Sequence, residues 1–505
     1  MNSSVVRRTV LIIAVAAFLV GIGAAARAEV EPNSLFSDGA VLQQGVAVPV
    51  WGAGKDGEQI IVKIQDQTAS TTVRDGRWLV RLKPMKAGGP FTMTITGDNT
   101  ISITNVLIGE VWLCSGQSNM AFHLAQAANA AEAIAAAGDS QLRLFTVPYG
   151  ATDTPKAEVP GSWKESSPET ARGFSAVAWF FGRELRRALK VPVGLINSSV
   201  GGTPAEAWTS RATLEADPGL REILERYAEQ VNKYDPVAAA AQHERAVEKH
   251  KQAVEKAEAA GEKPPRAPKA PADPRKSPVR PCGLYNAMIA PLEPYAIAGA
   301  IWYQGEANAS RAAQYQKLFP AMIQDWRQAW GQGDFPFFFV QIAPHQAMKP
   351  EIREAQLVSW QKVPRTAMAV ITDIGDEKDI HPTKKEPVGA RLALAARAIA
   401  YGENLEYSGP VYASLKIEGD HVVLSFTHIG SGLLAKDGEL KGFTIAGADG
   451  TFSAAKATIE VDKVVVSSPS VPQPVAVRYG WANTPDVNLF NKEGLPATPF
   501  RTDVK

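Results

Sequence analysis

Residues 109–120, with the sequence GEVWLCSGQSNM, decide the fold class of this chain. The apolar run 111–114 predicts a buried strand, the Ser-Gly-Gln-Ser that ends it predicts a turn, and the alanine-rich sequence beyond predicts a helix. A serine in such a turn lies outside the carboxyl end of a strand, where ligands bind in open α/β sheets. Ser118 is therefore a candidate nucleophile, although a serine at this position often serves only as a helix cap.

The same alternation of strand and helix continues over residues 106–402. Helical stretches are predicted at 176–189 and 388–400. The apolar strand runs are 111–114, 193–196, 298–303, 337–342 and 367–371. Strands that alternate with helices predict an α/β domain in which helices cover both faces of a mostly parallel sheet.

Two β-rich segments flank this domain. Residues 29–105 contain short β-prone runs separated by Gly and Asp turns, which predicts an N-terminal antiparallel β-sandwich module. Residues 403–505 predict a C-terminal β module, with strands at 412–417, 422–426 and 457–466. Residues 235–281 begin as an Ala/Glu/Lys helical run and continue as a Pro-rich tract, which predicts a solvated insertion within the central domain.

The first 28 residues have the features of a signal peptide. Arg7 and Arg8 precede the apolar run 10–26, and Ala-Arg-Ala at 26–28 is typical of a cleavage site. The run is shorter than the roughly 20 residues of a membrane span. We expect a mature chain that begins at Glu29, is exported to a periplasm or to the medium, and has no stable membrane insertion. An uncleaved anchor is the alternative.

The composition excludes several classes of protein. The chain has 505 residues, a length typical of about three domains, and its 45% of hydrophobic residues exclude wholesale disorder. The 53 Lys and Arg residues balance 52 Asp and Glu residues, so nucleic acid is not an expected partner. Two cysteines, Cys114 and Cys282, exclude a disulfide-dense scaffold and a Cys-built zinc site. We expect two separate buried thiols, with one bridge as the alternative.

A serine nucleophile needs a general base, and His381 has the most suitable context. It lies in the sequence DIGDEKDIHP at 373–382, on a loop between a predicted strand and a predicted helix. Asp379 lies two residues before it, and in an extended backbone the two side chains point the same way. His345, which follows the strand 337–342, is a competing candidate, and a solvated acidic loop with an incidental histidine is the other interpretation.

Two further strand ends carry candidate donors to an oxyanion. Gly201 and Gly202 follow the strand 193–196, and paired glycines let backbone N–H groups approach a ligand closely. Gln304, at the end of the strand 298–303, has an amide N–H, and Glu306 lies just beyond a glycine. Either segment alone is weak evidence, but together with Ser118 and His381 they form the set that acyl transfer requires.

These segments resemble the sialate O-acetylesterase family of SGNH-type hydrolases. The matching sequences are Gly-Gln-Ser-Asn-Met at 116–120, Gly-Gly-Thr at 201–203, Trp-Tyr-Gln-Gly-Glu at 302–306 and Asp-Ile-His-Pro at 379–382. Further similar phrases lie at 42–52, 204–208, 284–289 and 479–481, so the resemblance spans nearly the whole mature chain.

The resemblance implies a serine esterase on a three-layer α/β/α, flavodoxin-like sheet, with no metal and no cofactor. It implies that Ser118 is the nucleophile and that His381 is the base. It also implies that Gly202 and Gln304, with the backbone N–H of Ser118, form the oxyanion hole. Asp379 matches the acid of the family, while Asp376 or Glu306 could orient His381 instead.

The substrate that the resemblance implies is an O-acetylated sugar, most specifically an acetylated sialic acid. Acetylxylan or another acetylated polysaccharide is the alternative within the enzyme class, and an inactive carbohydrate-binding protein is the alternative outside it. Trp208, Trp302 and Tyr303 lie near the reacting strand ends, where their rings could contact a sugar, or they could be core residues.

Overall fold

The computed structural model describes residues 30–503, and its centre is a sheet of six parallel strands. Their spatial order is β9-β11-β8-β12-β13-β14, and the short β10 pairs antiparallel with β9 at one edge. The strands are β8 (Thr100–Gly116), β9 (Asp139–Thr146), β10 (Lys164–Ser166), β11 (Val193–Ser199), β12 (Gly299–Tyr303), β13 (Phe337–Val340) and β14 (Thr366–Ala369). The prediction of a mostly parallel α/β sheet is confirmed.

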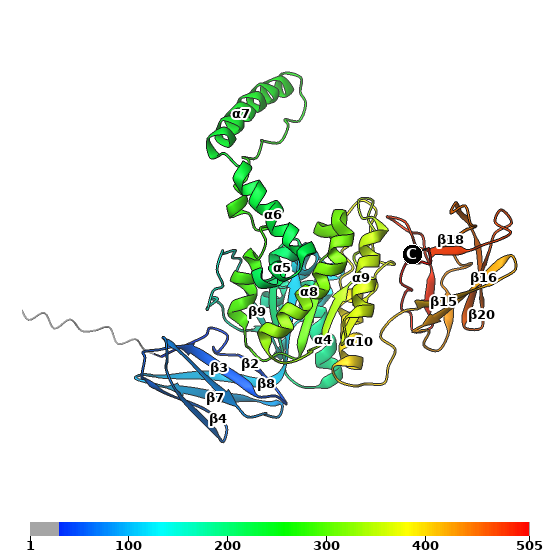
Figure 1. Cartoon of the computed structure of the whole chain (residues 1–505). Helices are drawn as coiled ribbons and strands as arrows, with labels where there is room; N and C mark the ends of the chain where they lie inside the picture. Colours follow the sequence, from blue (N-terminus) through cyan, green and yellow to red (C-terminus); the bar gives the residue numbers. More distant parts are fainter. Residues whose placement is uncertain (1–29, 504–505) are drawn as a thin grey trace, which may run out of the picture.

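Helices cover both faces of this sheet (Figure 1). Along β8, Val111 and Leu113 belong to one hydrophobic core, whereas Trp112 and Cys114 belong to the core on the opposite face. Because successive strand residues point to opposite faces, a strand buried on both sides is apolar throughout. The first core includes residues of α8 (Ala312–Trp330) and α9 (Pro350–Lys362), and the second includes residues of α4 (Ala176–Leu189) and α10 (Glu386–Ile399).

The N-terminal module consists of two small sheets. One sheet contains β1 (Glu31–Pro32), β3 (Val48–Ala53) and β6 (Arg77–Leu82). The other contains β4 (Gln59–Ile64), β5 (Gln67–Thr72), β7 (Gly88–Thr96), the first half of β8, and β2 (Val41–Gln43). Burial alternates along β4 and β6, as their sequences predict. The predicted boundary after residue 105 lies within β8, so one continuous strand serves both the module and the central sheet.

The C-terminal module has its own hydrophobic core. One sheet contains β15 (Val411–Glu418), β16 (His421–Thr427), β20 (Lys456–Glu460) and β21 (Lys463–Ser467). A second contains β18 (Phe443–Ala446), β19 (Phe452–Ala454), β22 (Ala476–Tyr479) and β24 (Phe500–Arg501), and β17 (Leu433–Ala435) pairs with β23 (Leu489–Asn491). The prediction of one strand at 457–466 is wrong, because the exposed Val461, with a φ of 57°, forms a turn between β20 and β21.

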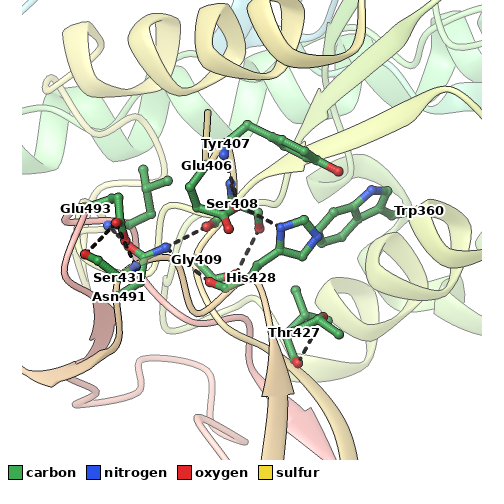
Figure 2. Close-up of polar contacts among 12 residues, drawn as sticks. Trp360, Glu406, Tyr407, Ser408, Gly409, Thr427, His428, Ser431, Asn491 and Glu493 are labelled. Carbon is green, nitrogen blue, oxygen red and sulfur yellow. Dashed lines mark hydrogen bonds and ion pairs between the residues drawn. The ribbon is translucent and has the colours of Figure 1, made fainter. Parts of the chain in front are cut away.

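Figure 2 shows a junction between the C-terminal module and α9. His428 Nδ1 lies 2.7 Å from a carboxylate oxygen of Glu406. The His428 ring packs near the rings of Trp360 and Tyr407, with centroid distances of 5.6 and 5.0 Å. The Ser431 hydroxyl donates to another glutamate rather than to this imidazole. The Glu406 carboxylate therefore orients the His428 ring within the module, and the packing of that ring against Trp360 joins the module to α9.

The insertion forms an arm that projects from the central domain (Figure 1). It follows α6 (Pro218–Lys233), continues as α7 (Pro236–Ala259), and returns through the Pro-rich tract, as its composition predicts. Within the described range, none of the helices combines the length and apolar character that crossing a membrane requires. The predicted signal peptide, residues 1–28, lies outside the described residues. Cys114 and Cys282 are buried free thiols, which confirms two separate thiols.

Candidate active site

The turn after β8 holds Ser118 at the carboxyl edge of the sheet. Gly116 has a φ of +139°, and a Cβ added there would lie 2.2 Å from the carbonyl oxygen of Tyr303. Only glycine fits this close approach. The backbone N–H of Gln117 donates to the same carbonyl at 2.9 Å and holds the two segments together. Ser118 then begins α1 (Ser118–Ala121), a helix far shorter than the alanine-rich sequence predicts.

Ser118 and His381 meet, although 263 positions separate them in the chain. His381 Nε2 lies 2.8 Å from Ser118 Oγ. The histidine comes from the loop between β14 and α10, and parallel strands bring such loops to one edge of a sheet. His345, the competing base, instead accepts the N–H of Ala347 through its Nδ1 at 3.1 Å. The contact is the nucleophile–base geometry of serine hydrolases.

Asp379 is the acid nearest to the other imidazole nitrogen. Its carboxylate lies 3.7 Å from His381 Nδ1 and accepts the backbone N–H of His381 at 2.8 Å. Asp376 accepts the backbone N–H groups of Lys378 and Asp379, so it shapes the loop and does not contact the imidazole. Asp379 thus lies near the imidazole of His381, as the i, i+2 spacing predicts. Its carboxylate is closer to the backbone N–H of His381 than to the imidazole nitrogen.

The surroundings of His381 favour its neutral form. Burial lowers the pKa of His381, the Asp379 carboxylate partly opposes this, and the positive charge of Lys385 and the nearby His345 lower the pKa further. An ordinary histidine has a pKa of about 6.5. A lower pKa leaves the imidazole unprotonated at neutral pH, which is the state that can accept a proton from Ser118.

Gly201 of the glycine pair lies beside Ser118, the candidate nucleophile. A Cβ added to Gly201 would lie 3.4 Å from the Cβ of Ser118. Gly202 has a φ of +73°, and a Cβ there would meet no atom within 4 Å. The first N–H groups of a helix have no acceptor within it, so the Ser118 N–H is not used by α1. The N–H of Ser118 is therefore a candidate oxyanion donor, and Gly202 follows directly after the glycine that contacts Ser118.

Gln304 is oriented differently from an oxyanion donor. Its buried amide Nε2 donates to Asn308 Oδ1 at 2.6 Å and to the Thr203 carbonyl at 3.3 Å. Both of its amide hydrogens therefore have acceptors within the protein. Donation to a substrate would require the longer bond, to Thr203, to open.

A buried polar network below Ser118 was not predicted. Asn119 Nδ2 donates to Glu306 Oε1 at 2.8 Å and to the Ile380 carbonyl at 3.0 Å, and Asn119 Oδ1 accepts from Lys385 Nζ. Burial raises the pKa of Glu306 and lowers that of Lys385 to about 7. Glu306 therefore supports the loop that carries His381 through Asn119, and does not contact the imidazole. Asn119 lies inside the quoted motif, but nothing in the sequence marks Lys385 as buried.

Of the two interpretations of Trp208, Trp302 and Tyr303, the structure supports core packing and not contact with a sugar. All three side chains are fully buried. The Trp208 and Trp302 rings pack edge to face with centroids 6.0 Å apart, and Lys385 Nζ lies 5.2 Å from the centroid of the Tyr303 ring. Since these strand ends are covered by helices on both faces, their aromatic residues belong to the core.

Comparisons with known proteins identify the family of this chain. The model of the family described as carbohydrate esterase, sialic acid-specific acetylesterase, matches residues 108–255 and 279–398. The sialate O-acetylesterase of Mus musculus is 34% identical over 426 residues, which cover 75% of either chain. That of Homo sapiens is 31% identical over 531 residues, which cover 92% of this chain and 91% of the human one. The crystal structure of a carbohydrate acetylesterase from Xanthomonas citri matches with a TM-score of 0.80 and 39% identity, covering 94% of this chain and all of that one. The chain therefore belongs to the sialic acid-specific acetylesterase family of carbohydrate esterases and is a carboxylic ester hydrolase.

Proposed function

We propose that this protein removes O-acetyl groups from sugars through an acetyl-Ser118 intermediate, on an SGNH-type three-layer domain flanked by two β modules. The 2.8 Å contact between Ser118 Oγ and His381 Nε2 is the observation that carries the proposal. It also argues against an inactive carbohydrate-binding protein, because such a protein needs neither group. The apolar N-terminal run favours action after export.

The mechanism follows from the positions of these groups. His381 Nε2 accepts the Ser118 proton as Oγ attacks the acetyl carbonyl carbon, and the carbonyl oxygen becomes an oxyanion. The backbone N–H groups of Ser118 and Gly202 donate to that oxyanion, and Gln304 joins them if its bond to Thr203 opens. The sugar oxygen leaves with the proton from His381. Water then gives a proton to His381 as its oxygen attacks the acetyl-enzyme, and when the bond to Ser118 Oγ breaks, His381 returns this proton to Oγ. Acetic acid, which ionises to acetate, and free Ser118 are released.

Asp379 has a role that the pH dependence of the reaction can test. Its negative charge raises the pKa of His381, against burial, Lys385 and His345, which lower it. We expect the acidic limb of the kcat/KM profile to lie below pH ~6.5, the value for an ordinary histidine. Asp379→Asn should move this limb to still lower pH, because the protonated imidazole loses a stabilising charge.

Glu377→Gln is the matched control, since it removes one exposed carboxylate from the same loop. The acidic limb of the kcat/KM profile of Glu377→Gln should coincide with that of the wild type. Because Asp379 is exposed, added salt should shrink the difference between Asp379→Asn and wild type. An acidic limb that is the same in all three proteins would contradict a role for Asp379.

The most specific substrate that we propose is an O-acetylated sialic acid, since the family model and the mammalian relatives carry that specificity in their names. Acetate release should be measured from O-acetylated sialic acid and from acetylated xylo-oligosaccharides under the same conditions. We expect a higher kcat/KM for the sialic acid. A preference for the xylo-oligosaccharides would replace the sialate assignment with a polysaccharide deacetylase, and activity on neither would contradict sugar deacetylation.

A further inference from the structure

A pocket that Pro204, three residues after Gly201, helps to line also contains three arginines. It has a volume of about 330 Å³ and contains Arg226, Arg280, Arg311 and a single acid, Glu206, in its wall. A volume of this size is typical of a site for a small ligand. The arginines come from α6, from the end of the insertion, and from η6 (Glu306–Arg311).

The negative charge in the wall is already satisfied. Glu206 Oε1 accepts from Arg311 Nη2 at 2.7 Å, and Glu206 Oε2 accepts from Asn308 at 2.8 Å. Both of these side-chain oxygens are thus occupied, and three guanidinium groups face one carboxylate. Arg280 is paired with the exposed Asp153 at 3.2 Å, so among the described residues Arg226 is the arginine of this pocket without an acidic partner, and its positive charge is the one that an anion would balance.

The arginines have more N–H donors than they have hydrogen-bond acceptors in the described structure. A guanidinium has five N–H donors. Arg226 gives Gln314 one bond, of 3.4 Å, and Arg280 bonds to the exposed Asp153 at 3.2 Å and to the Ser277 carbonyl. Arg311 Nε is buried and has no hydrogen-bond partner in the described part of the chain. A buried donor without an acceptor is costly, and a ligand acceptor would remove that cost.

The pocket is within reach of the nucleophile. Gly201 lies beside Ser118, since a Cβ added to this glycine would be 3.4 Å from the Ser118 Cβ. Pro204, which follows Gly201 by three residues, lines the pocket. Three Cα–Cα steps of about 3.8 Å span at most about 11 Å. A sugar acid that carries its carboxylate and an acetyl ester at opposite ends of a nine-carbon chain has a length comparable with this distance.

We propose that Arg226, Arg280 and Arg311 bind the carboxylate of an acidic sugar while its acetyl ester lies against Ser118. The inference rests on the proposed function and adds the feature that selects the substrate. Arginine forms bidentate, charge-assisted hydrogen bonds with carboxylates, and a neutral xylan chain has no group that uses them.

The test compares an O-acetylated sialic acid with its C1 methyl ester, which has the same shape without the charge. We expect the wild type to have a kcat/KM at least about tenfold higher for the free acid, since one lost charge-assisted hydrogen bond has about this effect. Arg226→Gln should bring the ratio of the two kcat/KM values towards one, mainly by raising the KM for the acid.

Arg221→Gln is the matched control, because it makes the same change on the exposed side of α6, outside the pocket. For Arg221→Gln, the ratio of kcat/KM for the free acid to kcat/KM for the methyl ester should equal that of the wild type. If the wild type cleaves the acid and the methyl ester equally well, or if Arg226→Gln keeps the wild-type ratio, the pocket does not bind the carboxylate. The esterase proposal would still stand in either case. If the wild type cleaves neither substrate nor a chromogenic acetyl ester, the proposed function itself fails.

Discussion

Ser118→Ala is expected to lower kcat for a chromogenic acetyl ester by a factor on the order of 10⁴ or more. The substitution removes the atom that attacks the carbonyl, and leaves only the oxyanion donors and substrate binding. His381→Ala should have a loss of similar size, because Nε2, 2.8 Å from Oγ, is the group that accepts the serine proton.

The double variant Ser118→Ala/His381→Ala distinguishes this mechanism from two independent contributions. Since the hydroxyl and the imidazole act as one unit, the double variant should be about as slow as either single variant. Ser115→Ala is the control. Its hydroxyl is buried on β8, three residues before the nucleophile, and has no partner in the described structure. It should keep wild-type activity, and equal rates for Ser118→Ala and the wild type would end the esterase proposal at this site.

Asn119→Ala is expected to have the largest effect among residues that do not touch the substrate. The side chain gives two hydrogen bonds and accepts a third, and its loss leaves Glu306 and Lys385 buried without their shared partner. Leaving a buried donor or acceptor without its partner typically costs about 1–3 kcal/mol, so the free energy of unfolding should fall by at least this amount. It also frees the Ile380 carbonyl, which adjoins His381, and a small displacement of the base can lower kcat by up to about 10²-fold.

A rescue experiment separates this positioning role from a general loss of stability. Asn119→Asp keeps the acceptor for Lys385 but places a second carboxylate against Glu306 Oε1. Adding Glu306→Gln restores a donor–acceptor pair in the reverse direction. The double variant should regain part of both the stability and the kcat that Asn119→Asp loses. If kcat is unchanged in Asn119→Ala, measured below its unfolding temperature, the network has no role in positioning His381.

The strand ranges of the central sheet could be predicted from the sequence because the signal is local. A strand buried on both faces is a short, continuous apolar run, and the predicted ranges for β11 and β14 lie within a few residues of the observed ones. The two predictions of secondary structure that were wrong, the single strand at 457–466 and the long helix after Ser118, also failed for local reasons. The turn at Val461 uses a residue that favours strands, and the alanine-rich sequence after Ser118 is divided by His123, which caps the next short helix instead of continuing α1.

The sequence by itself predicted the α/β fold class and the pair Ser118 and His381, which the structure brings to 2.8 Å of each other, because periodicity, strand-end position and motif spacing all act over short stretches of chain. The tertiary structure alone decided that Asp379 lies 3.7 Å from the imidazole, that both hydrogens of the Gln304 amide have acceptors, and that Trp208, Trp302 and Tyr303 are core residues. It also brought Lys385 under Asn119 and three distant arginines into one pocket. Burial and hydrogen-bond partners depend on which distant segments pack together, and no short pattern of residues records that packing.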